Sequence, residues 1–418
     1  MMTQAYYTGL SGLQNNSYGI DVVSDNLANI DTIGYRGNTY EFTSLFEDAL
    51  ATTSGDVTND TIGIGTSIQA TPMTQASGSY ITTDRSTDLA IEGDGWFGIS
   101  NGTDILYTKN GAFTFDSNAD LITNDGYHVL GTMGGNISDN TLTESLSSVP
   151  LGDVNAQEKL NFPETLTYPP QATTNVQFSG NIGVEDETRA MSAGVIDANG
   201  IQNELRLEFT KTEEQTGKGT QWKVVATTTS HDGQEIYDTQ EGLVSFDERG
   251  SLISSTLGSI DNNGSSIDID LGIEYSGIVA IANSDITSSS VADGVIGGEL
   301  IGYDINRDGE VIAGFSNGMQ SSVGKIALYH FQNDQGLSRV SGTDFSASSN
   351  SGDPIFYQDT EGNNILGSNI FNFRLEGSNV DMTYGLTELI ILQRAYDANS
   401  KSITTADEMI QKALNMDG

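Results

Sequence analysis

The sequence of 418 residues contains no cysteine, which excludes disulfide bonds, thiolate metal sites and thiol nucleophiles. Basic residues are also scarce, 17 against 57 acidic residues, and a formal net charge of -40 repels nucleic acid and anionic lipid headgroups. No apolar run approaches the length of a membrane span, and the first residues lack the basic and apolar regions of a cleaved signal peptide. We therefore expect no nucleic-acid binding, no membrane insertion and, if the chain is exported, another route.

Residues that could carry catalysis are few and scattered. The three histidines, His128, His231 and His330, do not occur in a metal-binding or catalytic spacing. The glycine-rich pieces lack the lysine of a phosphate-binding loop, and carboxylates are so abundant that their proximity identifies no acid–base pair. We predict that the chain is not an enzyme and binds no cofactor; a hydrolase is the weakest alternative.

The segment Asp304–Gly309 imitates a calcium loop, with oxygen-bearing side chains at alternate positions and a glycine at the turn. The twelfth position, however, is Phe315 rather than a glutamate, and no helices flank the loop. We predict a hairpin turn and no metal site, and keep an acidic, calcium-dependent extracellular adhesin as an alternative of another class.

Both ends of the chain are predicted to be long helices with an apolar stripe typical of a coiled coil. Three glycines in the N-terminal segment each cost about 1 kcal/mol in a helix, so this helix needs a partner. The C-terminal segment, free of glycine and proline from Leu386 to Asp417, supplies one. We expect a polymer interface along a helical seam of Tyr6, Leu10, Leu13, Ile20, Val23, Leu27, Leu389, Leu392, Tyr396, Ile403, Ala406 and Ile410.

Between the ends the apolar residues alternate, for example at Leu205, Leu207 and Phe209, which is typical of strands. Turn signals separate these segments, and residues 132–150 and 255–295 have the composition of long surface loops or junctions. The predicted fold is mainly β with α-helical termini: nested, discontinuous domains in which two sandwich-like or barrel-like β domains are inserted in a terminal helical layer.

The domain limits follow from this nesting. We expect a terminal helical domain at 1–36 and 378–418, a connecting region at 37–80 and 345–377, an inner β domain at 81–162 and 291–344, and an outer β domain at about 163–290.

Several motifs resemble those of the bacterial flagellar rod and hook proteins. Ser11-Gly12-Leu13 and the helix stop at 24–36 resemble the family's N-terminal signature, and residues 378–409 resemble its C-terminal element. Residues 93–113 and 126–131 resemble its middle. The residues that match the family's terminal motifs are Asn26, Ala28, Asn29, Thr32, Gly34, Tyr35, Asn379, Asp381, Gln393, Arg394, Tyr396 and Asn399.

Residues 302–318 and 331–337, together with the second inserted β domain, resemble hook rather than rod subunits. The resemblance implies a structural subunit that polymerises into a flexible tube and passes torque from the motor and rod to the filament. It further implies an extracellular flagellar location, type III export without a cleaved signal peptide, and contacts with copies of itself, the distal rod protein, the hook cap and the hook–filament junction proteins. A distal rod or accessory hook-like subunit is the alternative within the family.

Overall fold

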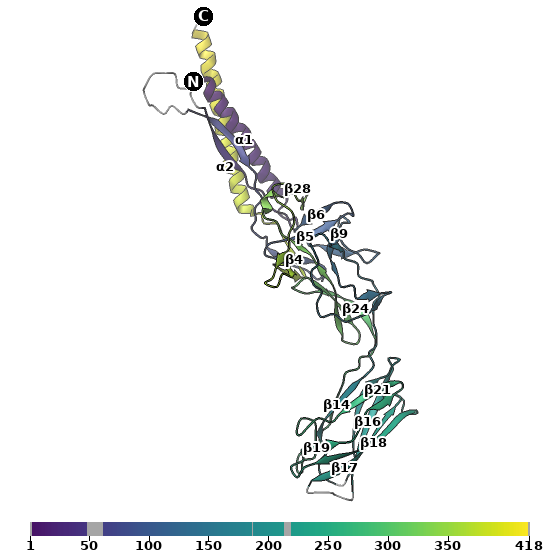
Figure 1. Cartoon of the computed structure of the whole chain (residues 1–418). Coiled ribbons are helices and arrows are strands. Elements are labelled where there is room, and N and C mark those ends of the chain that lie inside the picture. The colour runs from purple at the N-terminus through teal and green to yellow at the C-terminus, as the bar shows by residue number, and fades with distance from the viewer. Residues whose placement is uncertain (1, 48–61, 186, 213–218, 417–418) are drawn as a thin grey trace.

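The computed structural model describes residues 2–47, 62–185, 187–212 and 219–416. These residues form an elongated molecule with three parts in a line: a pair of helices, a large β body and a smaller β body (Figure 1). Both ends of the chain lie at the helical end (Figure 1). The prediction of a mainly β fold with helical termini and nested β insertions is confirmed.

The two helices run antiparallel. α1 spans Met2–Ala28 and α2 spans Met382–Met416. Near one end of the pair Gly9 of α1 lies against Ile403, and near the other end Leu27 lies against Gly385. Each helix therefore packs against the other along most of its length.

The start of α2 differs from the prediction. The helix begins at Met382 rather than at Leu386, and Gly385 lies inside it. The carboxylate of Asp381 accepts a hydrogen bond from the backbone N–H of Tyr384 at 2.8 Å and caps the first turn. Glycine has a low helix propensity, but the cap at Asp381 and the contact of Gly385 with Leu27 offset it.

A β-hairpin runs beside α1 on the way to the β bodies. Its strands are β1 (Glu41–Glu47) and β2 (Ile62–Ala70), which pair antiparallel. Asn15 of α1 donates a hydrogen bond to the hydroxyl of Thr66 at 2.7 Å. The N-terminal helix thus has α2 and β2 as neighbours within its own chain.

The large β body is built on a sheet of 15 described strands, with three two-stranded pairs at its side. Its strands come from two stretches of the chain. They are β4 (Leu89–Glu92), β5 (Trp96–Ser100), β6 (Ile105–Thr108), β7 (Phe113–Phe115), β8 (Leu121–Thr123), β9 (His128–Met133), β10 (Ile137–Ser138), β11 (Thr141–Leu142), β12 (Glu158–Lys159), β13 (Thr167–Tyr168), β24 (Gly298–Ile305), β25 (Glu310–Phe315), β26 (Gln320–Ile326), β27 (Leu328–Tyr329), β28 (Ser338–Ser341), β29 (Asp344–Ser346), β30 (Tyr357–Gln358), β31 (Asn364–Ile365) and β32 (Asn369–Asn372), with the short 3-10 helix η1 (Asp334–Gly336) and the pair β3 (Tyr80–Thr82) and β33 (Arg374–Glu376) next to the helices.

The core of this body is larger than the predicted inner domain. Leu166 and Tyr168 are buried in it, as are Phe345, Leu366 and Ile370 from the stretch that we expected to be a connecting region. The difference arises because β13 continues the main sheet by pairing with β24, and because β32 pairs with β4. Short paired segments without a clear alternation were not recognisable as core in the sequence.

The small β body is a sandwich of two five-stranded sheets. Apolar residues alternate into one shared core, and the predicted strand faces are confirmed: Phe209 pairs with Val224, and both side chains are buried. The strands are β14 (Asn175–Asn181), β15 (Arg189–Ile196), β16 (Gln202–Lys211), β17 (Thr220–Thr229), β18 (Ile236–Phe246), β19 (Leu252–Ser255), β20 (Ile260–Asn262), β21 (Ser265–Asp270), β22 (Ile278–Val279) and β23 (Ser289–Ala292).

The expectation of a long loop over 255–295 is wrong, because four strands of the sandwich lie in it. Three of these strands each place a buried isoleucine in the core, at Ile260, Ile267 and Ile278, although serine, asparagine and glycine surround them. Two chain segments, 169–174 and 293–297, connect the bodies, and a bridge between Gln171 and Val295 holds these segments together. The small body is therefore inserted as a hairpin into the large one.

Candidate assembly surface

The contact between α1 and α2 is made possible by glycine. A Cβ added at Gly9 would lie 2.9 Å from Cγ1 of Ile403, and one added at Gly19 would lie 3.0 Å from Cδ2 of Leu392. Gly12 faces Asn399 in the same way, at 2.8 Å from its Nδ2. The three glycines, which appeared only as a cost in the sequence, let the two backbones approach closely.

The predicted seam is divided between this contact and more open positions. Val23, Leu392 and Ala406 are buried within a single chain, and Leu392 lies against Gly19 of α1. Tyr6 is exposed. Most of the seam is half-buried: Leu10, Leu13, Ile20, Leu27, Leu389, Tyr396, Ile403 and Ile410. Whether these residues form the interface between subunits stays a prediction.

A second apolar face, which the seven-residue spacing missed, points away from the helix pair. On α2 the side chain of Ile391 is 61% exposed, and Ile390 next to it is exposed as well. On α1 two exposed tyrosines, Tyr7 and Tyr18, contribute to this face. Two further members, Tyr384 and Leu386, lie in the first turns of α2. We call Tyr384, Leu386, Ile390 and Ile391 the open face of α2; such a patch on a helix indicates a contact with another chain.

The N-terminal motif forms the turn that leads from α1 into the β bodies. The side chain of Asn26 accepts from the N–H of Asn38 at 2.9 Å and donates to its carbonyl at 2.7 Å. Asn29 accepts a hydrogen bond from the hydroxyl of Thr32 at 3.2 Å, and the buried Tyr35 donates to Asp25 at 2.9 Å. Burial and the hydrogen bond to the Asp25 carboxylate raise the pKa of Tyr35. These motif residues therefore fix the direction in which the chain leaves the helix.

Gly34 is required by two features at this turn. Its φ is +70°, a conformation that side chains disfavour, and an added Cβ would lie 2.5 Å from the backbone nitrogen of Asn110. Its N–H donates to the carbonyl of Glu376 at 2.7 Å. The turn thus packs directly against the large β body and the segment before α2.

The C-terminal motif divides into joint residues and helix residues. The amide of Asn379 accepts from the N–H of Gly37 at 2.8 Å and donates to the carbonyls of Thr74 and Ala76. Asp381 caps α2, as described above. The remaining motif residues lie on the helices: Ala28, Gln393 and Arg394 are exposed, whereas Tyr396 and Asn399 are half-buried.

A buried ion pair links the helices to the large β body. The guanidinium of Arg36 lies 2.9 Å from Oε1 of Glu376, and both side chains are almost fully buried. The same carboxylate accepts the N–H of Gly78 at 2.9 Å, while Arg36 also donates to the carbonyl of Ala76. We call this cluster, with Lys109 beside it, the helix–β joint.

Lys109 is the unusual member of the joint. Its Nζ donates to the carbonyl of Gly93 at 3.3 Å and lies 5.4 Å from the ring centre of Trp96. Burial, together with the positive charge of Arg36, lowers the pKa of Lys109 to about 8. The joint therefore carries more buried positive charge than a single ion pair can balance.

The calcium-like segment and His330, which could suggest metal binding or catalysis, make structural contacts instead. Asp304–Gly309 forms the predicted hairpin turn between β24 and β25, in which Asn306 accepts the N–H groups of Asp308 and Glu310. His330 is buried against Tyr357, and its Nε2 lies 2.6 Å from the carbonyl oxygen of Leu366. Within the described ranges, no group of three His, Asp or Glu side chains could hold a metal, and neither helix is apolar enough to cross a membrane.

Three family models match the chain, one at each end and one that begins in the large β body and reaches β14 of the small one. The model "Flagella basal body rod protein" matches residues 7–36, "Flagellar hook protein FlgE/F/G D1 domain" matches residues 90–184, and "Flagellar basal body rod FlgEFG protein C-terminal" matches residues 373–416. The two terminal matches cover α1 with its turn and β33 with α2. They therefore coincide with the candidate assembly surface.

Similar proteins match over almost their whole length. "Flagellar hook protein FlgE" of Borreliella burgdorferi is 24% identical, covering 99% of this chain and 100% of the relative. The proteins of the same name from Salmonella typhimurium and Brucella suis are 25% and 29% identical, and the matches cover at least 98% of each chain. The crystal structure of the Helicobacter pylori flagellar hook protein FlgE2 superposes with a TM-score of 0.55 at 16% identity, covering 71% of this chain and 100% of that one, so the fold is shared.

Proposed function

The chain belongs to the family of bacterial flagellar rod and hook proteins, and we propose on this premise that its copies pack through α1 and α2 into the wall of a hollow tube. It is a structural subunit of the flagellar hook, as the full-length relatives named for the hook indicate. Those relatives are named for the hook and not for the rod. A rod subunit is accordingly the less supported reading.

The open face of α2 carries the proposal. Ile390 and Ile391 expose apolar surface that no described part of the same chain covers, although α2 already has α1 as a partner. Burying such surface stabilises a contact by roughly 25 cal/mol per Å². In a tube, each helix pair would bury its open face against the helix pair of a neighbouring copy, while the half-buried seam residues would close the remaining gaps.

The β bodies would then form the outer part of the wall, because both leave the helix pair in one direction (Figure 1). Most of the acidic excess lies in these bodies; α1 has only Asp21 and Asp25 as charged residues. Charge on the outer bodies is screened within about 8 Å at physiological salt. This arrangement keeps repulsion between copies away from the apolar contact.

The finer expectations are part of the same proposal. The tube would bend while it passes torque from the rod to the filament. The partners besides further copies would be the distal rod protein, the hook cap, the hook–filament junction proteins and the type III export apparatus, and the tube would lie outside the cell. The subunit would have no catalytic activity.

Substituting one isoleucine tests the proposal. Ile391→Glu should abolish the formation of tubes, measured by sedimentation and negative-stain microscopy of the purified chain, because it places a charge in the buried contact. The matched control is Ile236→Glu in the small β body, since Ile236 is 63% exposed in the monomer and has the same side chain. Tubes of normal yield from the Ile391 variant would exclude α2's open face as the contact.

A further inference from the structure

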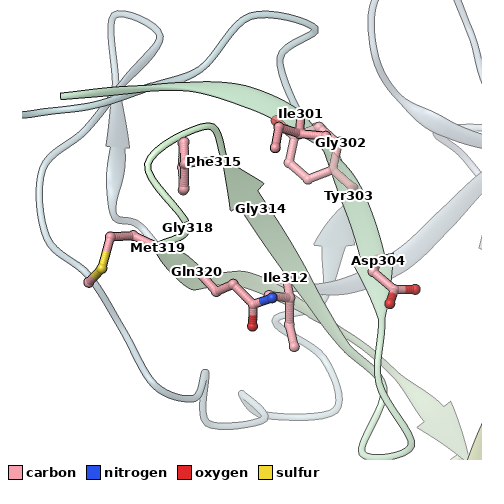
Figure 2. A pocket seen from close by; sticks show the side chains of 10 residues that line it. All are labelled: Ile301, Gly302, Tyr303, Asp304, Ile312, Gly314, Phe315, Gly318, Met319 and Gln320. Atoms are coloured by element: carbon pink, nitrogen blue, oxygen red, sulfur yellow. The ribbon is translucent and has the colours of Figure 1, made fainter. Parts of the chain in front are cut away.

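The outward face of the large β body has a hollow at the strand pair β24–β25. Gly302 and Gly314 lie directly opposite each other in this pair, and Asp304 with Ile312 is the next outward pair. A β-bulge between Leu300 and Gly302 displaces Ile301 from the ladder, and its side chain is 77% exposed. Two glycines therefore lie in the hollow, and the apolar side chains around them include the exposed Ile301 and the half-buried Ile312 and Met319 (Figure 2).

No residue that the structure describes fills this hollow. A Cβ added at Gly302 would meet no atom within 4 Å, and the cavity has a volume of about 440 Å³. Glycine inside a strand loses conformational entropy and often marks a place where another chain comes close. The lining comprises Ile301, Gly302, Tyr303, Asp304, Ile312, Gly314, Phe315, Gly318, Met319 and Gln320 (Figure 2).

A group of exposed apolar side chains that could enter the hollow lies on the small β body. The bridge between Leu252 and Glu274 sets Ile253 beside Ile273, and these side chains are 66% and 76% exposed. Tyr275 is exposed next to them. We call Ile253, Ile273 and Tyr275 the distal cluster.

The distal cluster and the hollow lie at different distances from the segments that connect the two β bodies. β14 leaves the connecting segments at Asn175, and its far end at Asn181 pairs with β22, which follows the distal cluster in the chain. The cluster is therefore at the end of the small body that is remote from the connection. The hollow is close to the connection, because Asn317 beside it donates to the carbonyl of Ile296 at 2.8 Å.

We propose that the hollow at Gly302 and Gly314 receives the distal cluster of a second copy of this chain. The inference rests on the proposed function, since it requires a polymer. In a helical tube every contact joins two different surfaces, so an apolar hollow needs a separate apolar projection on the same chain. The described residues offer this pair.

Charge supports the choice of occupant. Asp304 is exposed at the edge of the hollow, and Arg249 is exposed in the turn that precedes β19 and the distal cluster. Arg249 makes no ion pair with another described residue. Arg249 could therefore pair with Asp304 when the distal cluster enters the hollow, which adds an opposite-charge contact to the apolar one.

Docking of this kind staggers two copies along their long axes by about the length of the small body. A copy added at one end of the tube would thus hold the copy below it through its β bodies as well as through its helices.

Photo-crosslinking of the full chain tests the pairing directly. A benzophenone amino acid at Ile301 in assembled tubes is expected to join to the peptides that contain Arg249–Ile253 or Ile273–Tyr275 of another copy. The same probe at Ala190, an exposed strand position of the small body, should not label these peptides. Cross-links from position 301 that consistently reach other segments would overturn the proposal.

A filled hollow provides a second test. Gly302→Val adds a strand-forming side chain in open space, so the monomer should melt at an unchanged or higher temperature, while the critical concentration for tubes should rise at least about tenfold. Ala190→Val is the matched control and should assemble normally. Charge reversal adds a signature that a folding defect would not give: Asp304→Arg and Arg249→Asp should each weaken assembly, and the double variant should restore it.

The outcomes separate the two proposals. A wild-type chain that forms no tubes overturns the proposed function and this inference together. Wild-type tubes, combined with normal assembly of Gly302→Val and no rescue in the charge-reversed double variant, overturn this inference alone.

Discussion

Replacing Gly9 by alanine should loosen the pair of terminal helices, whereas the same change at Gly12 should tighten it. Both glycines lie inside α1, where alanine is favoured over glycine by about 1 kcal/mol. The gain in helix propensity is the same at the two positions. Any difference between the two variants must therefore come from α2.

The side chains opposite the two glycines differ in stiffness. The new Cβ at position 9 would lie 2.9 Å from Cγ1 of Ile403, a β-branched residue with one preferred rotamer in a helix. Overpacking of this kind costs about 1–3 kcal/mol, so the net change at Gly9 is a loss of up to about 2 kcal/mol. At Gly12 the added Cβ would meet the end of the Asn399 side chain, with Nδ2 at 2.8 Å and Cγ at 3.0 Å; this flexible side chain can move away, and the net change is a gain of up to about 1 kcal/mol.

Hydrogen exchange of the α1 amides in the monomer, followed by mass spectrometry, measures the opening of the helix pair directly. Exchange in α1 should be faster than wild type in Gly9→Ala and slower in Gly12→Ala. Ile403→Ala provides the control, because in that background Gly9→Ala no longer meets Cγ1 and should protect α1. Equal protection by the two single glycine variants would refute the packing argument.

Three other changes test the joint and the cap. Glu376→Gln leaves the buried Arg36 without its partner and should lower the free energy of unfolding by about 3–5 kcal/mol in a urea titration. Burial lowers the folded-state pKa of Lys109 to about 8, so below pH 8 the folded protein carries the full cost of a buried charge. This cost disappears as the pH rises from about 8 to the ordinary value of 10.5. The free energy of unfolding of wild type, relative to that of Lys109→Met, should therefore rise by about 3 kcal/mol between these pH values. Asp381→Ala should cost about 1 kcal/mol and speed hydrogen exchange at the N–H of Tyr384, and unchanged exchange there would contradict the capping role.

Strong periodicity made much of the fold predictable. The alternation at Leu205, Leu207 and Phe209 identified a strand correctly, because each of these side chains enters one core. The turn predicted at Asp304–Gly309 also occurs in the structure, where it joins β24 to β25 and Gly309 has a positive φ. Local sequence patterns therefore predicted the structure where a strand alternates into a single core or a glycine ends a turn.

Features that depend on a distant segment were not predictable. The glycines of α1 have no meaning until α2 lies against them, and the seven-residue spacing therefore pointed to Leu389 rather than to the open face at Ile390 and Ile391. The burial of Arg36 depends on Glu376, a residue far away in the chain. The hollow between Gly302 and Gly314 likewise exists only once the two strands pair in this register.

The bridge between Gln171 and Val295 makes the small β body a removable cassette. Its two attachment points lie side by side on adjacent extended segments, so a short turn could join them and leave the remaining sheet unbroken. A foreign module whose own ends are close together could be grafted there without changing the helical wall. Surface decoration of the tube and construction of its wall are thus separable design problems within a single chain.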